Sequence, residues 1–364
     1  MNRLINMYGF SILPYLKRQD ARVLNTVNTV MHESVESRTW QREQTEFVHS
    51  INFRRGESNI EGISLTPDEN HLLVCDRYNN CVMVFDVRDV DGIYKRGELR
   101  GTLINKYGYP DGQLLYHPSQ AVVVPQTGQV VVSEFTKHTV VVFSSIHSDT
   151  VVRTLGDGHG RGPRQFRHPS SIAVLDDQDG PIAVVADSYN YRLSLFRIDD
   201  GTLLRHMVTA GSEDIASGIP PTFPSGPGIR AVTVVPAMMM GNEDALILVT
   251  AWIHNCVYVV TRDGDVVGIL KGNDSIQLGG LLNSVTVCAL TGEVMVTDKV
   301  NQRSGAVVAW RLSDGGGLRV VCSGTGDSRN PFPFRNPHGI VASRDGQQLW
   351  VADSENERLC LFRL

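Results

Sequence analysis

Acidic residues recur along this chain at positions where their carboxylates could gather into one site. Each follows an apolar run, and in four copies a Phe comes nine residues after the acid. The acids are Asp76, Glu134, Asp187, Asp298 and Asp353, and Ala251 takes the equivalent place in one degraded copy. A ring of carboxylates could serve general acid–base chemistry. Their regular recurrence instead favours a structural role, in which each acid binds turn amides or the nearby Arg of its own copy.

A second candidate for chemistry is a Gly-rich stretch that carries several arginines. Arg161, Arg164 and Arg167 stand there, with Arg153 before them and His168 after them. Arg side chains on a loop can contact phosphates, so this patch is a candidate site for RNA or another anion. The formal net charge of −5 gives the chain no general attraction to nucleic acid. A solvated loop is the alternative interpretation.

Other signatures of catalysis are missing from the sequence. It contains no G-x-S-x-G, H-E-x-x-H, Walker or G-x-G-x-x-G motif. The acidic segment 176–180 resembles the start of a calcium loop but lacks the downstream Glu, which makes a polar hairpin turn the better interpretation. We therefore expect no cofactor and no metal, and we predict that the protein is not an enzyme.

The spacing of the acids predicts the elements that position them. The six marker positions lie 47 to 64 residues apart, about the length of one four-stranded propeller blade. Another apolar strand precedes each marker, and outer strands such as 99–103 and 151–155 follow. Val, Ile and Leu dominate these runs, as expected of strands packed between neighbouring blades. The pattern predicts an all-β chain built from six repeated units.

The composite motif resembles the NHL repeat. It consists of a Gly-rich loop, Gln-Phe, a Pro, an apolar strand and then V-x-D-x-x-N-x-R-[LV]-x-[LV]-F. Two copies match it most closely, Asp187 to Phe196 with Arg192 and Asp353 to Phe362 with Arg358. The resemblance extends over about residues 57 to 364 and recurs in register. It implies a six-bladed β-propeller of four-stranded blades.

The last copy stops before its outer strand. An open ring would leave unpaired strand edges, which folded proteins avoid. The segment 46–53 precedes the first inner strand and reads as a strand itself. We predict that it pairs with the C-terminal strand at 357–364 and closes the ring. The propeller domain would then comprise residues 46–364, and residues 1–45 would form a separate N-terminal extension.

The resemblance also indicates where a propeller enzyme would hold its site. Such enzymes use residues at the starts of the inner strands, and one with a related fold, the peptidyl-hydroxyglycine lyase, binds zinc there through histidines. The matching positions here are Glu61, Ser119, Ser170, Ile229, Asn283 and His338. One His and one Glu among six do not make a three-ligand zinc site. If the protein is an enzyme, we expect Glu61, Arg230 and His338 to line its channel.

The N-terminal extension contains a predicted helix that begins after Asp20. Its apolar residues Leu24, Val27, Met31 and Val35 fall on one stripe. The segment before it carries Arg and Lys but no acid, so a mitochondrial presequence is an alternative to a docking arm.

No apolar run is long enough to span a bilayer. The six cysteines are predicted to be free and largely in strands, which favours a reducing, cytoplasmic location, cytoskeletal assemblies included.

Three function classes remain after these observations. We favour a non-catalytic scaffold that binds other proteins, as a subunit of a larger assembly, through its loops and N-terminal arm. The predicted partner contacts are Phe223 in a long Pro- and Gly-rich insertion and the adaptable side chains of Met238, Met239 and Met240. A lyase or hydrolase that uses the channel is one alternative. An RNA-associated scaffold in a ribonucleoprotein or mitochondrial assembly is the other.

Overall fold

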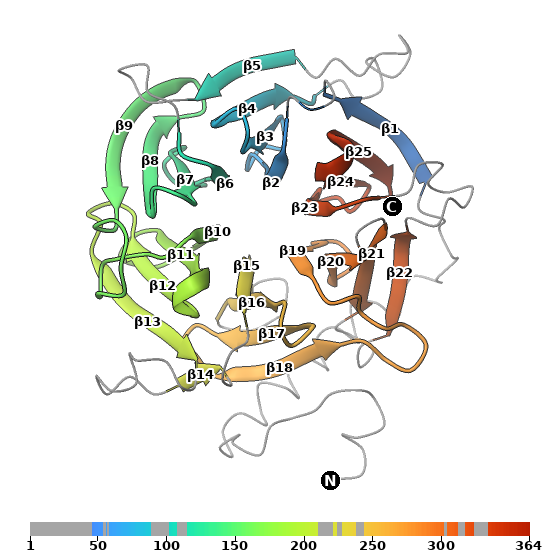
Figure 1. Cartoon of the computed structure of the whole chain (residues 1–364). Coiled ribbons are helices and arrows are strands. Elements are labelled where there is room, and N and C mark those ends of the chain that lie inside the picture. Colours follow the sequence, from blue (N-terminus) through green and yellow to red (C-terminus); the bar gives the residue numbers. More distant parts are fainter. Residues whose placement is uncertain are drawn as a thin grey trace.

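The protein folds into a ring of six β-sheets around a central axis, as the computed structural model shows (Figure 1). The structure describes residues 46–53, 56, 58–88, 102–107, 115–209, 221–223, 228–237, 244–301, 304–311, 317–323 and 334–364. The extension at 1–45, with its predicted helix, lies outside these residues. Within the described part, no helix is long and apolar enough to cross a bilayer.

Each sheet is one blade, whose first strand lies nearest the axis. Blade 1 contains β2 (Ile60–Leu65), β3 (His71–Asp76), β4 (Cys81–Asp86) and β5 (Thr102–Tyr107). Blade 2 contains β6 (Pro118–Val123), β7 (Val130–Glu134), β8 (Thr139–Ser145) and β9 (Ser148–Leu155). Blade 3 contains β10 (Pro169–Leu175), β11 (Ile182–Asp187), β12 (Arg192–Arg197), β13 (Leu203–Thr209) and β14 (Pro221–Phe223).

The other three blades follow the same plan. Blade 4 contains β15 (Ile229–Val235), β16 (Leu246–Ala251), β17 (Cys256–Thr261) and β18 (Val266–Lys271). Blade 5 contains β19 (Leu282–Val287), β20 (Glu293–Asn301), β21 (Ser304–Arg311) and β22 (Leu318–Ser323). Blade 6 contains β23 (Pro337–Ala342), β24 (Gln348–Asp353), β25 (Arg358–Arg363) and β1 (Glu46–Asn52). Two short 3-10 helices, Ser188–Asn190 and Ser354–Asn356, lie between the second and third strands of blades 3 and 6.

The predicted closure of the ring is confirmed. Strand β1 is the outer strand of blade 6 and pairs antiparallel with β25, from Glu46 opposite Arg363 to Asn52 opposite Arg358. Figure 1 shows β1 beside β25, although the two lie at opposite ends of the chain.

Five blades have the predicted four strands, whereas blade 3 has a fifth. Its extra strand β14 runs parallel to β13, with Val208 opposite Pro221 and Thr209 opposite Phe223.

The hydrophobic core lies between the blades. It divides into six clusters, each formed by the facing strands of two neighbouring blades. The Phe that recurs nine residues after the acid supplies a large buried side chain, as Phe196 and Phe362 do. The Phe of the Gly-rich loops packs on it: Phe166 lies 5.4 Å from Phe196, and Phe334 lies 5.9 Å from Phe362. The repeated motif is thus the packing unit of the ring.

All six cysteines are buried and free, as predicted.

Two faces result from this plan, because the strands of a blade alternate in direction. We call the loop face the surface formed by the loops after each second strand and by the connections into each first strand. The turns that join the first to the second strand and the third to the fourth strand form the hairpin face. The six first strands run in the same direction along the axis. Equivalent loops of all six blades therefore lie on the same face.

Candidate functional site

The repeated acids hold the loop face together, as predicted. Asp353 accepts hydrogen bonds from the backbone N–H of Arg335 at 2.9 Å, from Asn356 Nδ2 at 2.6 Å and from Arg358 Nε at 3.0 Å. Asp187 repeats this arrangement with Arg167, Asn190 and Arg192. The remaining acids also bind a backbone N–H of the connection that enters their own blade, at Asn59, Tyr116 and Gly279. Each acid therefore fixes the start of its inner strand.

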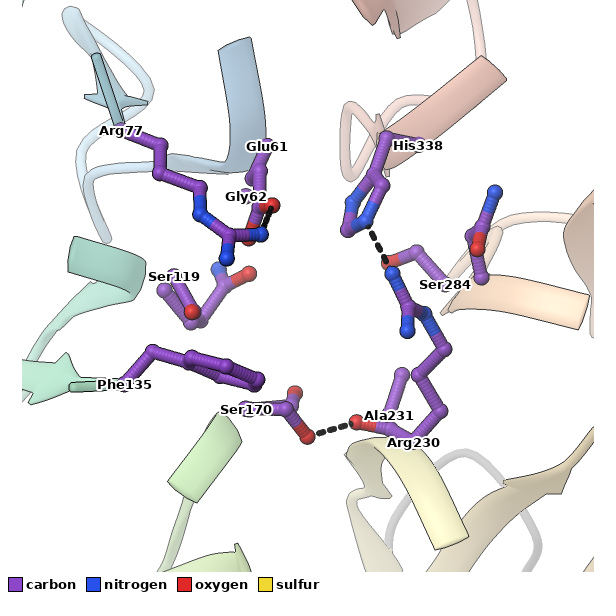
Figure 2. A pocket seen from close by; sticks show the side chains of 13 residues that line it. Glu61, Gly62, Arg77, Ser119, Phe135, Ser170, Arg230, Ala231, Ser284 and His338 are labelled. Atoms are coloured by element: carbon purple, nitrogen blue, oxygen red, sulfur yellow. Dashed lines mark hydrogen bonds and ion pairs between the residues drawn. The ribbon is translucent and has the colours of Figure 1, made fainter. Parts of the chain in front are cut away.

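The starts of the six inner strands meet at the centre of the loop face. There they line a cavity together with two residues from neighbouring loops, Arg77 and Phe135 (Figure 2). Glu61, Arg230 and His338, the three channel candidates, all lie in this cavity. Their common location follows from strand register, since each is the second residue of its inner strand.

The sequence-based assignment of the channel position in blade 4 was wrong by one residue. The spacing places Ile229 at the channel position of blade 4, whereas strand pairing places Arg230 there. Ile229 lies opposite Ala251, as Pro118 lies opposite Glu134, so Arg230 is the equivalent of Ser119. Ile229 is completely buried between blades 3 and 4. The error arose because the degraded marker and the long turn of blade 4 offered no fixed reference for counting.

Two pairs of charged or polar side chains face each other across the cavity. Arg77 Nη1 binds Glu61 Oε1 at 2.6 Å, and Arg230 Nη2 lies 2.6 Å from His338 Nε2. Because a guanidinium only donates hydrogen bonds, His338 Nε2 must accept, and its proton resides on Nδ1. Figure 2 shows the two pairs on opposite sides, with Ser119 on the side of Arg77 and Ser170 at the lower edge of the view. Ser170 also donates to the backbone carbonyl of Arg230 and so ties blades 3 and 4 together.

The protonation of the two pairs differs. Burial lowers the pKa of His338, Glu61 opposes this effect, and Arg230 and Arg77 reinforce it, so that the pKa is about 4. Burial alone would raise the pKa of Glu61, but His338, Arg77 and Arg230 together bring it below its ordinary value. At neutral pH the cavity therefore holds a neutral imidazole, an ionised carboxylate and two guanidinium groups. Its lining carries a net positive charge.

The cavity is small. Its volume is about 40 Å³, room for about two or three water molecules. Glycines bring the inner strands this close: a Cβ at Gly62 would lie 2.2 Å from the carbonyl oxygen of Ser119, and one at Gly339 would lie 2.4 Å from that of Glu61. Further along the axis, the inner strands line a second cavity of about 290 Å³, whose walls mix apolar residues such as Ile63 and Val232 with polar ones such as Gln120.

Two residues of the central cavity were missed by sequence reasoning. Arg77 and Phe135 are the residues that directly follow the acids of blades 1 and 2. The acid binds the entering loop, so the next residue turns towards the axis. The Arg77 guanidinium lies 4.9 Å above the Phe135 ring, which in turn lies 4.4 Å from the His168 ring. The position after each marker was the available signal.

Exposed aromatic and aliphatic side chains surround this centre. Most of the large hydrophobic side chains that the described residues expose lie on the loop face, and they come from all blades but the sixth. They are Tyr78, Tyr116, Tyr189, Tyr191, Trp252, Ile253, Leu281 and Val300. We call these eight the apolar set of the loop face. The hairpin face exposes Leu290, and the outer strands expose Val152, Leu204 and Val320.

Acidic side chains gather instead on the hairpin face. Among the residues that the structure describes, its turns carry many carboxylates and fewer basic groups, and several of the carboxylates are exposed. They are Asp68, Glu69, Asp176, Asp177, Asp179, Asp199, Asp200, Asp263, Asp265 and Asp345. The overall negative charge of the chain therefore does not describe the loop face, whose centre is positive.

The arginines of the Gly-rich loop do not converge on one point. Arg164 binds Asp157 at 3.3 Å and the carbonyl of Gly201 at 2.8 Å, and it lies over the Phe196 ring. Arg167 is tied through its backbone N–H to Asp187, while Arg161 is exposed. Because His168 stacks between Phe135 and Tyr189, it belongs to the loop face. Binding of RNA by this patch stays a prediction.

The predicted partner contacts are only partly described. The backbone of Phe223 ends strand β14, and Met238, Met239 and Met240 lie outside the described residues. Their contact with a partner also stays a prediction. Across the described ranges, no three His, Cys, Asp or Glu side chains lie close enough together to hold a metal ion.

A family model for the NHL repeat matches residues 334–362, the segment from Phe334 to the Phe of the last blade. With the six-bladed ring and the acid-centred loops, this match decides the type of fold. The chain is an NHL-type propeller. No curated protein matches its sequence.

Solved structures share the fold of this NHL-type propeller at low sequence identity. A Bacteroides thetaiotaomicron protein of unknown function matches with a TM-score of 0.56 and 14% identity, over 88% of this chain and 73% of that chain. Virginiamycin B lyase from Staphylococcus aureus matches with a TM-score of 0.54 and 13% identity, over 88% and 100%. Kuenenia stuttgartiensis hydrazine synthase matches with a TM-score of 0.53 and 16% identity, over 83% of this chain and 75% of that chain. Identities this low establish a common fold alone.

Proposed function

We propose that the protein is a non-catalytic scaffold that binds a partner protein through its loop face. The observation that carries this proposal is the apolar set, which concentrates exposed Tyr, Trp and Ile on one face of the ring. Isolated exposed hydrophobic residues are common, but a group of them on a single face marks an interaction surface. Tyr, Trp and Arg are also the residue types that most often dominate binding energy at protein interfaces.

The central cavity supports a non-catalytic role. A general base works best when its pKa lies near the working pH. His338 has a pKa of about 4 and its Nε2 is occupied by Arg230, so it is a weak base at neutral pH. Glu61 is held by Arg77. The cavity volume of about 40 Å³ also leaves little room for a substrate beside these groups.

A protein fits the loop face better than RNA does. Nucleic acid affinity rests mainly on cations that are free to contact phosphates. Three cations of this face are already paired: Arg77 with Glu61, Lys137 with Glu134 at 3.8 Å and Lys299 with Glu355 at 2.7 Å. Lys137 also lies 5.3 Å from the centre of the Tyr116 ring. An RNA-associated role is therefore an outcome of the test and not the proposal.

The test compares a loop-face variant with a matched variant of the hairpin face. Tyr189→Ala with Trp252→Ala removes two exposed aromatic side chains from the apolar set. Leu290→Ala removes an exposed apolar side chain from the hairpin face. The full-length proteins, tagged identically, are used for affinity purification, and the proteins and RNA that co-purify are quantified.

We expect proteins that co-purify with the wild type and with Leu290→Ala to be depleted about tenfold or more with the double variant, as for the loss of a binding hot spot. Circular dichroism and thermal unfolding check that both variants are folded. Equal recovery with all three proteins would overturn the proposal. Recovery of RNA that depends on the loop face, without protein, would replace it with the RNA-associated role.

A further inference from the structure

The described residues that line the central cavity carry more positive than negative groups. Two guanidinium groups, from Arg77 and Arg230, enter it from opposite sides, whereas Glu61 is the only carboxylate among the described residues of its lining. The imidazole of His338, which also lines the cavity, is uncharged at neutral pH. Arg77 has its charge balanced by Glu61 at 2.6 Å, but the polar partner of Arg230 is the uncharged imidazole of His338. One guanidinium charge in the cavity is therefore not balanced by a direct ion pair.

Two donors in the cavity also lack acceptors. Within the described part of the chain, Arg230 Nε and Ser119 Oγ have no hydrogen-bond partner, and both atoms are shielded from solvent. Ser119 is 4% exposed. A shielded donor without an acceptor destabilises the folded state, and hydrogen bonds from charged donors are stronger than neutral ones. An acceptor that carries a negative charge would satisfy both donors and the unbalanced charge together.

The size of the cavity selects among small anions. Its volume of about 40 Å³ accommodates about two or three water molecules, and a carboxylate has three heavy atoms. The planar carboxylate also matches the fork of a guanidinium, which can donate two parallel hydrogen bonds to it. A phosphate group has five heavy atoms and a higher charge. The cavity therefore fits a carboxylate better than a phosphate.

The position of the cavity indicates what presents the carboxylate. It lies at the centre of the loop face, whose surrounding loops carry the apolar set, and it is too small to enclose a whole metabolite. We propose that it binds one carboxylate group of the partner protein, from an acidic side chain or a C-terminus. This inference rests on the proposed function, because the apolar set would bind the surrounding surface of the same partner. Arg230 is its main ligand, and Ser119 and Arg77 contribute from the opposite side.

The first part of the test measures the cavity without any partner. Sodium acetate is titrated into the full-length protein, and the Arg Nε–H and His imidazole signals are followed by NMR. Sodium chloride at the same ionic strength is the control for salt. We expect saturable shifts of the Arg230 and His338 signals with acetate and not with chloride. Arg230→Gln should weaken acetate binding about tenfold or more, the loss expected for one charge-assisted bidentate group.

Two further variants keep the result interpretable. Arg230→Lys retains the charge without the fork, so acetate should bind to it more weakly than to the wild type but more tightly than to Arg230→Gln. Arg164→Gln removes an Arg outside the cavity and should leave the acetate affinity unchanged. Shifts that match those with chloride, or an acetate affinity that Arg230→Gln does not alter, would overturn the inference. Water alone would then fill the cavity.

The second part distinguishes the sources of the carboxylate. N-acetylglycine presents a C-terminal carboxylate, and N-acetylaspartate amide presents an acidic side chain. Tighter binding of one of these than of acetate identifies the form that the partner presents. Arg230→Gln should also lower partner recovery in affinity purification. Acetate binding with recovery that Tyr189→Ala and Trp252→Ala do not affect would retain the cavity as a carboxylate site and reject the proposed function. Binding of acetate but of neither N-acetyl probe would overturn a partner-presented carboxylate.

Discussion

At the scale of single residues, the acids that recur along the chain are structural. Each lies at the end of a second strand and binds a backbone N–H of the connection into its own blade. Their periodicity in the sequence was sufficient to predict this role. The same periodicity marks the position that follows each acid, but it did not predict Arg77 or Phe135, because the residue type at this position differs from copy to copy. Such single residues give the centre of the loop face its chemistry.

We predict that Asp353→Ala destabilises the protein by about 3–5 kcal/mol, because it leaves Arg358 buried without its ion-pair partner. Chemical unfolding monitored by tryptophan fluorescence measures the change. The matched control is Asp263→Ala in an exposed turn, which should change stability by no more than about 0.5 kcal/mol. Similar effects of the two substitutions would show that Asp353 does not hold its loop.

We predict that His338 titrates at a pKa of about 4 in the folded protein. Its ordinary value in the unfolded chain is 6.5. The neutral imidazole therefore stabilises the fold fully above pH 6.5, and this contribution is lost as the pH falls through 6.5 towards 4. In His338→Gln the loss is absent, so the difference in unfolding free energy between wild type and variant should narrow over this range. A titration of the His338 imidazole near pH 6.5 by NMR would contradict the buried pair with Arg230.

At the scale of elements, the repeat predicted where the strands lie better than it predicted which residue takes each position within a strand. The runs of Val, Ile and Leu placed the strands of all six blades, and the missing outer strand of the last copy led to the pairing of β1 with β25. The one-residue error at Ile229 shows the limit, since side chains in a strand alternate between its two faces. Strand β14 was missed because three residues in a Pro- and Gly-rich insertion carry too little pattern.

We predict that Ser50→Cys forms a disulfide with Cys360 under oxidising conditions. The two residues are directly opposite each other on β1 and β25, so their side chains lie on the same side of the sheet within the usual reach of a disulfide. Closure of so long a loop should stabilise the protein by about 3–5 kcal/mol. Peptide mapping detects the cross-link, and thermal unfolding measures its effect.

Ile51→Cys is the matched control for this cross-link. Ile51 is opposite Leu359, and its side chain points to the other side of the strand, so it should not react with Cys360. A cross-link from position 51 in place of position 50 would mean that β1 is shifted in register. Absence of a cross-link from both positions would contradict closure of the ring by β1.

At the scale of the whole molecule, the two faces of the ring differ in chemistry. The loop face combines the apolar set with a positive centre, and the hairpin face carries most of the acidic turns. Composition could not reveal this, because a net charge of −5 averages over both faces. The ring architecture separates residues that alternate along the sequence. A scaffold role of the loop face and a cytoplasmic or mitochondrial location stay proposals from sequence and surface.

Hydrogen exchange of the purified complex tests the central claim most directly. The full-length protein, free and bound to the partner recovered by affinity purification, is compared peptide by peptide. We predict slower exchange in the bound state at the loops 77–80, 135–138, 188–191 and 252–255, with the hairpin turns 66–70 and 262–265 unchanged. Protection confined to the hairpin turns, or equal exchange in the free and bound states over all of these loops, would contradict binding through the loop face.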